Sequence, residues 1–279
     1  MVEFLRRSRL EVIPAAGVER AVFEHVPRDV TVTVTSSPTR GAEATFALTE
    51  RLVGEGYSVV PHLAARLIAD RTALVALLER FDAAGVRDVF VVAGDISRPA
   101  GHFEGAADLL AAMAEVGHGL ERIGITGYPE SHAFISDDET IQAMFVKIPF
   151  ASYIVSQICF DAGVIAQWIR RVRDRGVALP IYIGLPGPID AVRLLRLSKR
   201  VGLGDSARFL RRHGSWMGRL VRPRPYRPEL LLERLAPDLA RNDNAIAGLH
   251  LYTFNEVEET EKWRHRELER LQAPIADAM

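Results

Sequence analysis

The sequence predicts a single-domain (β/α)8 barrel, a TIM barrel, over residues 1–279. Short runs rich in Val and Ile alternate with longer amphipathic stretches from one end of the chain to the other. Most of these runs are almost continuously apolar, which is typical of parallel strands covered on both faces. Eight such strands, each followed by a helix, also suit a length of 279 residues.

The expected strands follow one another in order at residues 9–14, 30–36, 57–61, 89–92, 122–126, 153–159, 180–184 and 246–254. Residues 71–85 predict a helix, because Leu74, Leu77, Leu78 and Phe81 recur at helical spacing and Gly85 stands where a C-cap is favoured. Residues 161–176 predict another, which ends in cations followed by a glycine. The alternative is a doubly wound open sheet. Neither a strand–GxGxxG–helix motif nor a Walker-type loop supports that alternative.

The connection between the seventh and eighth strands is extended, at about sixty residues, and we expect two helices joined by a basic loop there. Its 208–227 segment could hold a ligand that bears phosphate or carboxylate, through Arg219, Arg222, Arg224 and Arg227 with Trp216 and Tyr226. The interpretation that we favour is a solvated connector whose arginines pair with surface carboxylates.

Composition excludes several classes of protein. A formal net charge of -1 gives no reason to expect nucleic acid or an anionic membrane as a partner. The single cysteine, Cys159, excludes an intrachain disulfide, suits a reducing compartment and is expected to be buried. The amino terminus lacks the apolar region of a signal peptide, and no apolar run approaches the ~18 residues of a membrane span. We therefore expect a cytoplasmic protein, and homo-oligomerisation stays open.

In a barrel, the active site lies at the carboxyl ends of the strands. The residues expected there are Gly94 and the polar residues Glu11, Thr35, His62, Asp95, Tyr128, Glu130, His132, Gln157, Asp161, His250, Tyr252 and Asn255. Each also has a structural interpretation: Asp95 or Asp161 could cap the next helix, and a lone histidine could simply be hydrogen-bonded. Together they predict a polar rim at one mouth of the barrel. The histidines and the cysteine show no zinc-ligand spacing, so no metal is expected.

These strand ends resemble the methylenetetrahydrofolate reductase family. The similarity runs nearly end to end, in the order "LEVIP", "VTVTSSP", "PHL", "AGD", "GYPESH", "SQICFD" and "GLHLYTFN". The resemblance implies an oxidoreductase that reduces 5,10-methylenetetrahydrofolate to 5-methyltetrahydrofolate. It makes Glu11 the general acid of ring opening, for which we expect a raised pKa. Asp95 would hold the pterin and stabilise the cationic intermediate.

The resemblance also assigns binding residues. Gln157 would hold the pterin edge, and Tyr252 would lie near the folate. Thr35, His62, Gly94, Tyr128 and His132 match positions around the family's FAD, with Lys147 as the one cation on the helix that follows. Ala93 replaces a common Arg, and Ile141, Met144 and Phe145 stand where the family presents polar groups to the diphosphate. We therefore hypothesise that flavin is weakly bound or absent and that NADH donates hydride directly.

Two alternative functions stay open, a deazaflavin-dependent pterin reductase and a non-catalytic folate-binding protein. Glu11 argues against the second, since pterin binding alone requires no acid there. The choice between NADH and NADPH is not readable from the sequence.

Overall fold

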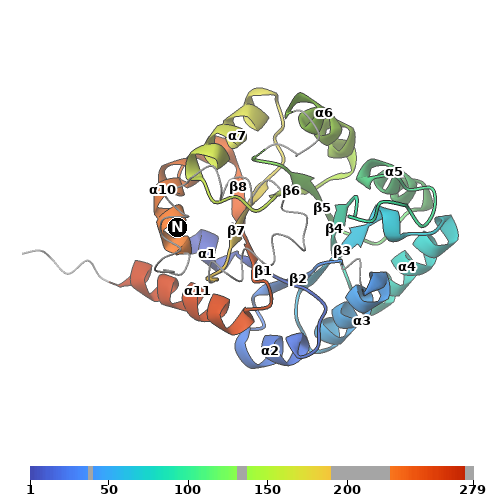
Figure 1. The fold of residues 1–279 in the computed structure, drawn as a ribbon, viewed down its shortest axis with the longest axis horizontal. Coiled ribbons are helices and arrows are strands. Elements are labelled where there is room, and N and C mark those ends of the chain that lie inside the picture. Colours follow the sequence, from blue (N-terminus) through green and yellow to red (C-terminus); the bar gives the residue numbers. More distant parts are fainter. Residues whose placement is uncertain (37–39, 131–136, 190–226, 274–279) are drawn as a thin grey trace, which may run out of the picture.

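The computed structural model describes residues 1–36, 40–130, 137–189 and 227–273 and has eight parallel strands that close into a barrel in chain order (Figure 1). The predicted fold class is confirmed. The strands are β1 (Arg9–Val12), β2 (Thr31–Val34), β3 (Val59–Ala64), β4 (Asp88–Val92), β5 (Arg122–Gly127), β6 (Tyr153–Ser156), β7 (Ile181–Pro186) and β8 (Ile246–Tyr252). Most predicted strands differ from these by a few residues at their ends, where turns replace the ladder.

Helices surround the barrel, and a helix follows each strand (Figure 1). A short helix, α1 (Val2–Arg6), precedes β1. The others are α2 (Val18–His25), α3 (Gly41–Gly54), α4 (Arg71–Ala84), α5 (Ala106–Val116), α6 (Asp137–Lys147), α7 (Ala162–Asp174), α10 (Pro228–Leu239) and α11 (Val257–Gln272), with 3-10 turns η1 (Ala65–Leu67), η2 (Ile148–Phe150) and η4 (Asn242–Asn244). Within the described residues, no helix is long and apolar enough to cross a membrane.

Both predicted helices are confirmed. In α4 the four apolar residues at helical spacing are buried, and Gly85 ends the helix at φ +80°. Asp161 caps α7, because its Oδ1 accepts hydrogen bonds from the backbone N–H of Gly163 at 2.8 Å and of Val164 at 3.1 Å. Asp161 is therefore a structural residue. Cys159 is buried as expected, and its thiol lies 3.3 Å from Oε1 of Glu130.

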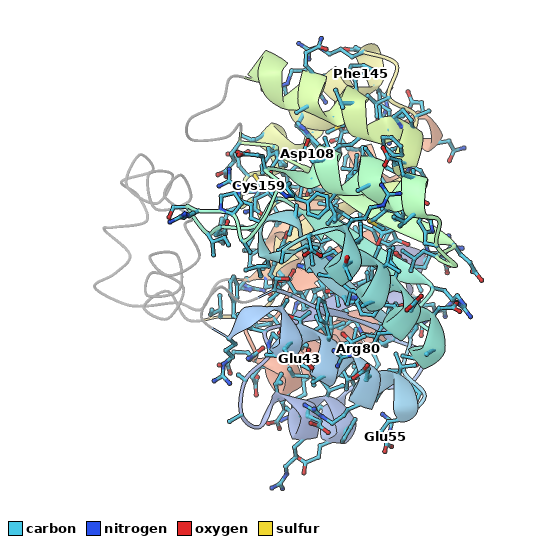
Figure 2. All side chains as sticks on the ribbon, turned by 90° about the vertical axis from the view of Figure 1, so that its right-hand side faces the viewer. Glu43, Glu55, Arg80, Asp108, Phe145 and Cys159 are labelled. Carbon is cyan, nitrogen blue, oxygen red and sulfur yellow. The ribbon has the colours of Figure 1, made fainter. Side chains whose placement is uncertain are left out.

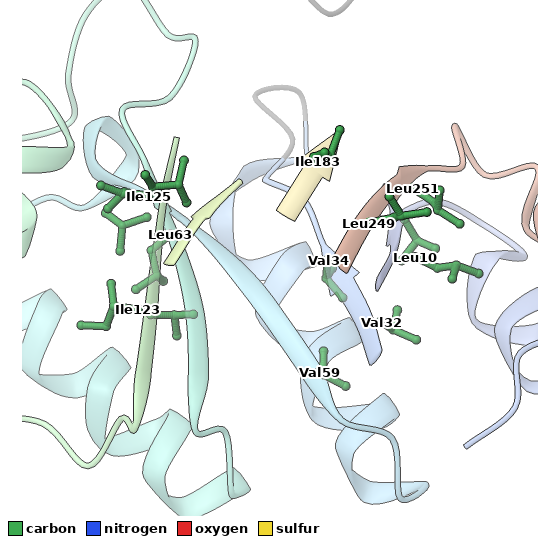
Figure 3. Close-up of a cluster of buried hydrophobic side chains, with 14 of the residues drawn as sticks. Leu10, Val32, Val34, Val59, Leu63, Ile123, Ile125, Ile183, Leu249 and Leu251 are labelled. Carbon is green, nitrogen blue, oxygen red and sulfur yellow. The ribbon is translucent and has the colours of Figure 1, made fainter. Parts of the chain in front are cut away.

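Side chains alternate between the two faces of each strand. In β1, Leu10 and Val12 face the helices and are fully buried there, and equivalent residues of β2, β5, β7 and β8 join the same apolar layer (Figure 3). Arg9 and Glu11 occupy the alternate positions and face the interior of the barrel. The barrel interior is therefore polar at these positions because polar and apolar residues alternate along the strand.

The amino-terminal end of the barrel is filled by a charged and aromatic cluster. The Arg9 guanidinium lies 4.0 Å from the ring centroid of Tyr182 and 4.4 Å from that of Tyr153. Its Nη2 donates to Asp88 at 3.0 Å, and the Tyr153 hydroxyl donates to the same carboxylate at 2.7 Å. We call Arg9, Asp88, Tyr153 and Tyr182 the barrel floor.

The outer surface carries ion pairs between neighbouring helices. Arg80 of α4 pairs with Glu43 of α3 at 2.8 Å (Figure 2). Phe145 of α6 lies on the outside of the same molecule, with 36% of its surface exposed (Figure 2).

Candidate active site

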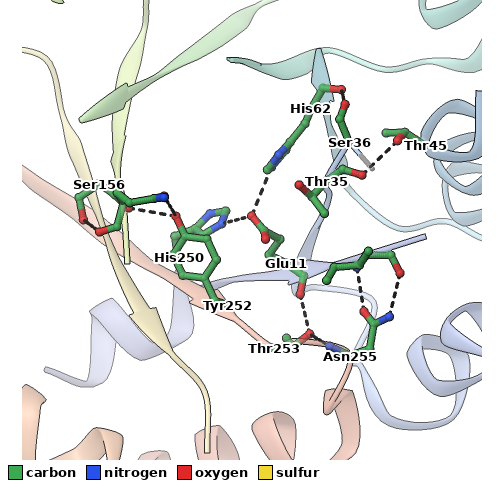
Figure 4. Close-up of polar contacts among 12 residues, drawn as sticks. Glu11, Thr35, Ser36, Thr45, His62, Ser156, His250, Tyr252, Thr253 and Asn255 are labelled. Carbon is green, nitrogen blue, oxygen red and sulfur yellow. Dashed lines mark hydrogen bonds and ion pairs between the residues drawn. The ribbon is translucent and has the colours of Figure 1, made fainter. Parts of the chain in front are cut away.

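Glu11 lies inside the barrel between two histidines (Figure 4). Its Oε2 is 3.0 Å from Nε2 of His250 on β8 and 3.5 Å from Nε2 of His62 on β3. The side chain of Glu11 keeps 13% exposure, whereas those of both histidines are almost completely buried. A partly buried carboxylate with two buried imidazoles is therefore held at the centre of the site.

The pKa of the Glu11 carboxyl differs from the expected one. Burial alone would raise the pKa of the Glu11 carboxyl, but the hydrogen bond with His250 and the nearness of both imidazoles outweigh it, so the pKa lies below its ordinary value. The expected raised pKa is therefore wrong for the chain without ligand, because the apolar strand brings Glu11 to two histidines. Burial lowers the pKa of His62 to about 4, so that this imidazole is neutral near pH 7.

The end of β8 fixes the backbone of β1. The hydroxyl of Thr253 donates to the carbonyl of Glu11 at 2.6 Å. The side-chain amide of Asn255 accepts from the N–H of Ile13 at 2.8 Å and donates to its carbonyl at 2.9 Å, so it replaces a strand partner. Asn255 adopts φ +65°, a left-handed conformation that Asn tolerates. These contacts hold Glu11 in register beside β8.

Tyr252 closes one side of the mouth. Its hydroxyl donates to the carbonyl of Ser156 at 3.2 Å and lies 3.5 Å from Oε1 of Gln157. Burial, with Glu11 and Tyr128 nearby, raises the pKa of Tyr252 well above its ordinary value, so the phenol stays protonated. The structure therefore brings Glu11, Gln157, Tyr128 and Tyr252 together.

The remaining predicted residues follow β2 and β4. Thr35 comes directly after β2 and is half-buried. Gly94 adopts φ +95° after β4, and a Cβ there would lie 3.1 Å from that of Ala64. Asp95 is exposed beside it and does not cap the next helix, because α5 begins eleven residues later and its N-cap is Gly105. The interpretation of Asp95 as a helix cap is wrong.

Arg66, on η1 behind β3, holds the loop that carries Gly94 and Asp95. Its backbone N–H donates to the carbonyl of Ala93 at 2.9 Å, and its guanidinium donates to the carbonyls of Ile96 at 3.1 Å and Glu104 at 2.8 Å. The sequence alone indicates no role for Arg66. A cation in a loop carries no periodic signal that would identify such a contact.

Lys147 does not join this group. It lies in the last turn of α6, which runs from the carboxyl end of β5 back toward the start of β6, and so it is near the floor end of the barrel. Burial lowers the pKa of Lys147 to about 8. His132 and residues 208–226 of the basic segment lie outside the described residues. Arg227, at the start of α10, is exposed and pairs with Glu229 at 2.6 Å.

Glu11, His62 and His250 also form a donor set of the kind that divalent transition metals use. Their ligand atoms lie within 4.8 Å of one another. The sequence shows no metal-ligand spacing because these residues come from three separate strands. His250 was expected at the mouth of the barrel, but the resemblance assigned it no role in binding or catalysis. Its alternation with Leu249 and Leu251 in β8 indicates an inward position.

Comparison with known proteins identifies the family. The family model of methylenetetrahydrofolate reductase matches residues 15–205, about two thirds of the chain. The chain belongs to the methylenetetrahydrofolate reductase family. The predicted resemblance is thereby confirmed. The match includes His62, Asp95 and Gln157, whereas Glu11, His250 and Tyr252 lie outside its range and join them through the closure of the barrel.

A curated relative is "Methylenetetrahydrofolate reductase 1" of Schizosaccharomyces pombe (strain 972 / ATCC 24843). It is 28% identical over 189 residues, which cover 64% of this chain and 31% of the relative. The chain thus spans about a third of the length of this curated relative.

Solved structures with a similar arrangement include the tryptophan synthase subunit alpha of Legionella pneumophila str. Paris, at 10% identity and a TM-score of 0.43, with 63% of this chain and 71% of that chain covered. The sialic acid aldolase of Ruminococcus gnavus is 14% identical with a TM-score of 0.43, and 64% and 62% of the two chains are covered. These likenesses are too weak to bear on function.

Proposed function

We propose that the chain reduces 5,10-methylenetetrahydrofolate to 5-methyltetrahydrofolate with a nicotinamide donor. The observation that carries this proposal is the carboxylate of Glu11, held inside the barrel of a family member and bordered at the mouth by Gln157 and Tyr252. The deazaflavin-dependent and non-catalytic alternatives gain no separate support from these contacts.

The chemistry needs one proton and one hydride. Protonated Glu11 gives its proton to a nitrogen of the imidazolidine ring, the bond from that nitrogen to the methylene carbon breaks, and an iminium cation forms. The dihydronicotinamide then transfers hydride to the methylene carbon, giving the methyl group and the oxidised nicotinamide. Asp95 and Gln157 would bind the amide and amino edge of the pterin, and a carboxylate there would stabilise the cation.

The lowered pKa of Glu11 in the free chain fits this role when the folate covers the mouth. The ring system would remove the remaining exposure of the Glu11 side chain, and greater burial favours the neutral, protonated carboxyl. Glu11 would therefore take up its proton as the substrate binds.

The described side chains of α6, from Ile141 to Lys147, do not fit a tightly bound flavin. A diphosphate needs cations or backbone N–H groups. Ile141 and Met144 are buried in the protein, Phe145 is apolar, and Lys147 lies near the opposite end of the barrel. This supports NADH as the direct hydride donor, with FAD weakly bound or absent. The purified protein should be colourless, without flavin bands in its visible absorbance spectrum. A yellow protein with stoichiometric FAD would contradict this part of the proposal.

The general acid is tested by Glu11→Gln, which keeps the shape of the side chain and removes its acid. We expect NADH oxidation with methylenetetrahydrofolate to be abolished while the affinity for folate stays close to that of the wild type. The matched control is Glu79→Gln, an exposed position on α4, and it should leave both quantities unchanged. If Glu11→Gln lost turnover and binding in parallel, the acid role would be refuted.

A further inference from the structure

The two oxygens of the Glu11 carboxylate have different surroundings. Both histidines approach Oε2: His250 Nε2 lies at hydrogen-bond distance, 3.0 Å, and His62 Nε2 lies farther away, at 3.5 Å (Figure 4). Neither contact uses Oε1. The side chain of Glu11 keeps 13% exposure, and its contacts with the two histidines leave Oε1 unused.

Ring nitrogens of the two histidines that lack a hydrogen-bond partner indicate which nitrogen of His250 carries its proton. Nδ1 of His250 is buried and has no hydrogen-bond partner among the described residues. A proton on that nitrogen would be a buried donor without an acceptor, which costs more than an unpaired acceptor lone pair. The proton therefore sits on Nε2, and His250 donates it to Oε2 of Glu11. Nε2 of His62 also lacks a hydrogen-bond partner within the described part of the chain, so His62 contacts the carboxylate without holding it.

The position of His250 is itself fixed. Its ring is 1% exposed and packs edge-on against that of Tyr252, with centroids 4.8 Å apart. The ring of Phe90 lies 6.4 Å away on another side. An imidazole confined in this way can hold a carboxylate oxygen in one place.

We propose that His250 is a positioning residue for Glu11. Its Nε2–H occupies Oε2, so that Oε1 is the oxygen that carries the proton to the folate nitrogen. This inference rests on the proposed function, because it assigns the acid of that reaction to one atom. The titratable groups that face the pair are His62 from β3, Tyr252 from β8 and Tyr128 after β5.

The kinetic test compares His250→Leu, which removes the donor, with His250→Gln, whose amide can still donate to Oε2. An acid must be protonated to act, so kcat/KM falls as pH rises through its pKa. Loss of the donor leaves His62 as the only histidine that opposes the effect of burial, and therefore raises the pKa of Glu11. In His250→Leu we therefore expect this fall to begin about one pH unit higher, with kcat lowered roughly 10- to 100-fold by misplacement and KM for the folate little changed. His250→Gln should restore the wild-type pH profile.

The control is His118→Leu, an exposed histidine after α5, which should keep the wild-type profile. A thermal melt of each variant shows that it is folded. An unshifted pH profile in His250→Leu, or equal losses in both His250 variants, would overturn the positioning role.

A second readout needs no turnover. In 15N-histidine NMR spectra of the wild type, assigned with His250→Gln, His250 should be the Nε2–H tautomer. The Nδ1–H tautomer, or stoichiometric zinc in the purified protein, would overturn the inference, because the imidazole could then not donate to Oε2. A wild-type chain with the expected tautomer and no reductase activity would instead refute the proposed function, and the positioning role with it.

Discussion

Replacing Gly184 with alanine should destabilise the barrel, because β7 has no room for a methyl group at this point. A Cβ at Gly184 would lie 2.1 Å from the carbonyl oxygen of Ser156 and 2.8 Å from Cε2 of Tyr252, whereas ordinary contacts begin at 3.4 Å. The first obstacle is backbone of the neighbouring strand, which cannot rotate away. Strand β7 would have to move by more than 1 Å relative to β6, or the Tyr252 ring would have to leave its position.

The expected cost follows from overpacking in a closed interior. Inserting a methyl group into a well-packed core costs about 1–3 kcal/mol, and we expect Gly184→Ala to reach the upper end because backbone must move. For a chain of this size, about 3 kcal/mol lowers Tm by roughly 6–12 °C. Displacement of Tyr252 should also raise KM for the folate about tenfold, which corresponds to ~1.4 kcal/mol.

The assay is thermal and urea denaturation of the variant, followed by steady-state kinetics. The control is Gly54→Ala at the end of α3, where an added Cβ meets nothing within 4 Å, and we expect unchanged or slightly increased stability there. A Gly184→Ala protein within 0.5 kcal/mol of the wild type would refute the packing argument.

Two further predictions concern stability. Because the pKa of His62 is about 4 in the folded chain and 6.5 is its ordinary value, protons bind the unfolded chain more readily between these pH values. The free energy of unfolding, measured in urea, should therefore fall by about 3 kcal/mol as pH drops from 6.5 to 4. His62→Gln should weaken this pH dependence. If the variant lost as much stability as the wild type over the same pH range, the reasoning would be contradicted. Asp161→Ala removes the N-cap of α7 and should lower the free energy of unfolding by about 1 kcal/mol. The control Asp174→Ala, in the last turn of α7, should leave it unchanged. Equal melting temperatures for Asp161→Ala and the wild type would count against the cap.

The fold could be predicted from sequence because its signals are periodic and local. Apolar runs mark the eight strands. Gly85 ends a helix through its left-handed conformation, and Asp161 begins one through hydrogen bonds to residues two and three positions later, so both signals are local. Placement of candidates at the mouth followed from one rule of barrels, that strand carboxyl ends meet at one end. Lys147 shows the limit of that rule, since a residue of the following helix can lie at either end.

The contacts at the centre of the site could not be predicted, because they join distant parts of the chain. Glu11 and His250 are separated by 239 positions, and their contact exists only because β8 closes against β1. The direction of the pKa shift of Glu11 depends on that contact, so the local apolar sequence gave the wrong sign. Likewise, the anchoring of Asn255 on Ile13 requires the register of two strands that are far apart in sequence.

The barrel floor has a consequence for the order of events in the site. Arg9, Tyr153 and Tyr182 are buried side chains that fill the amino-terminal end, so within the described residues Glu11 is reached from the mouth side. Two reactants that exchange a hydride beside Glu11 would therefore share one entrance, and the one seated deeper must enter first and leave last. Product inhibition patterns would then identify which reactant that is.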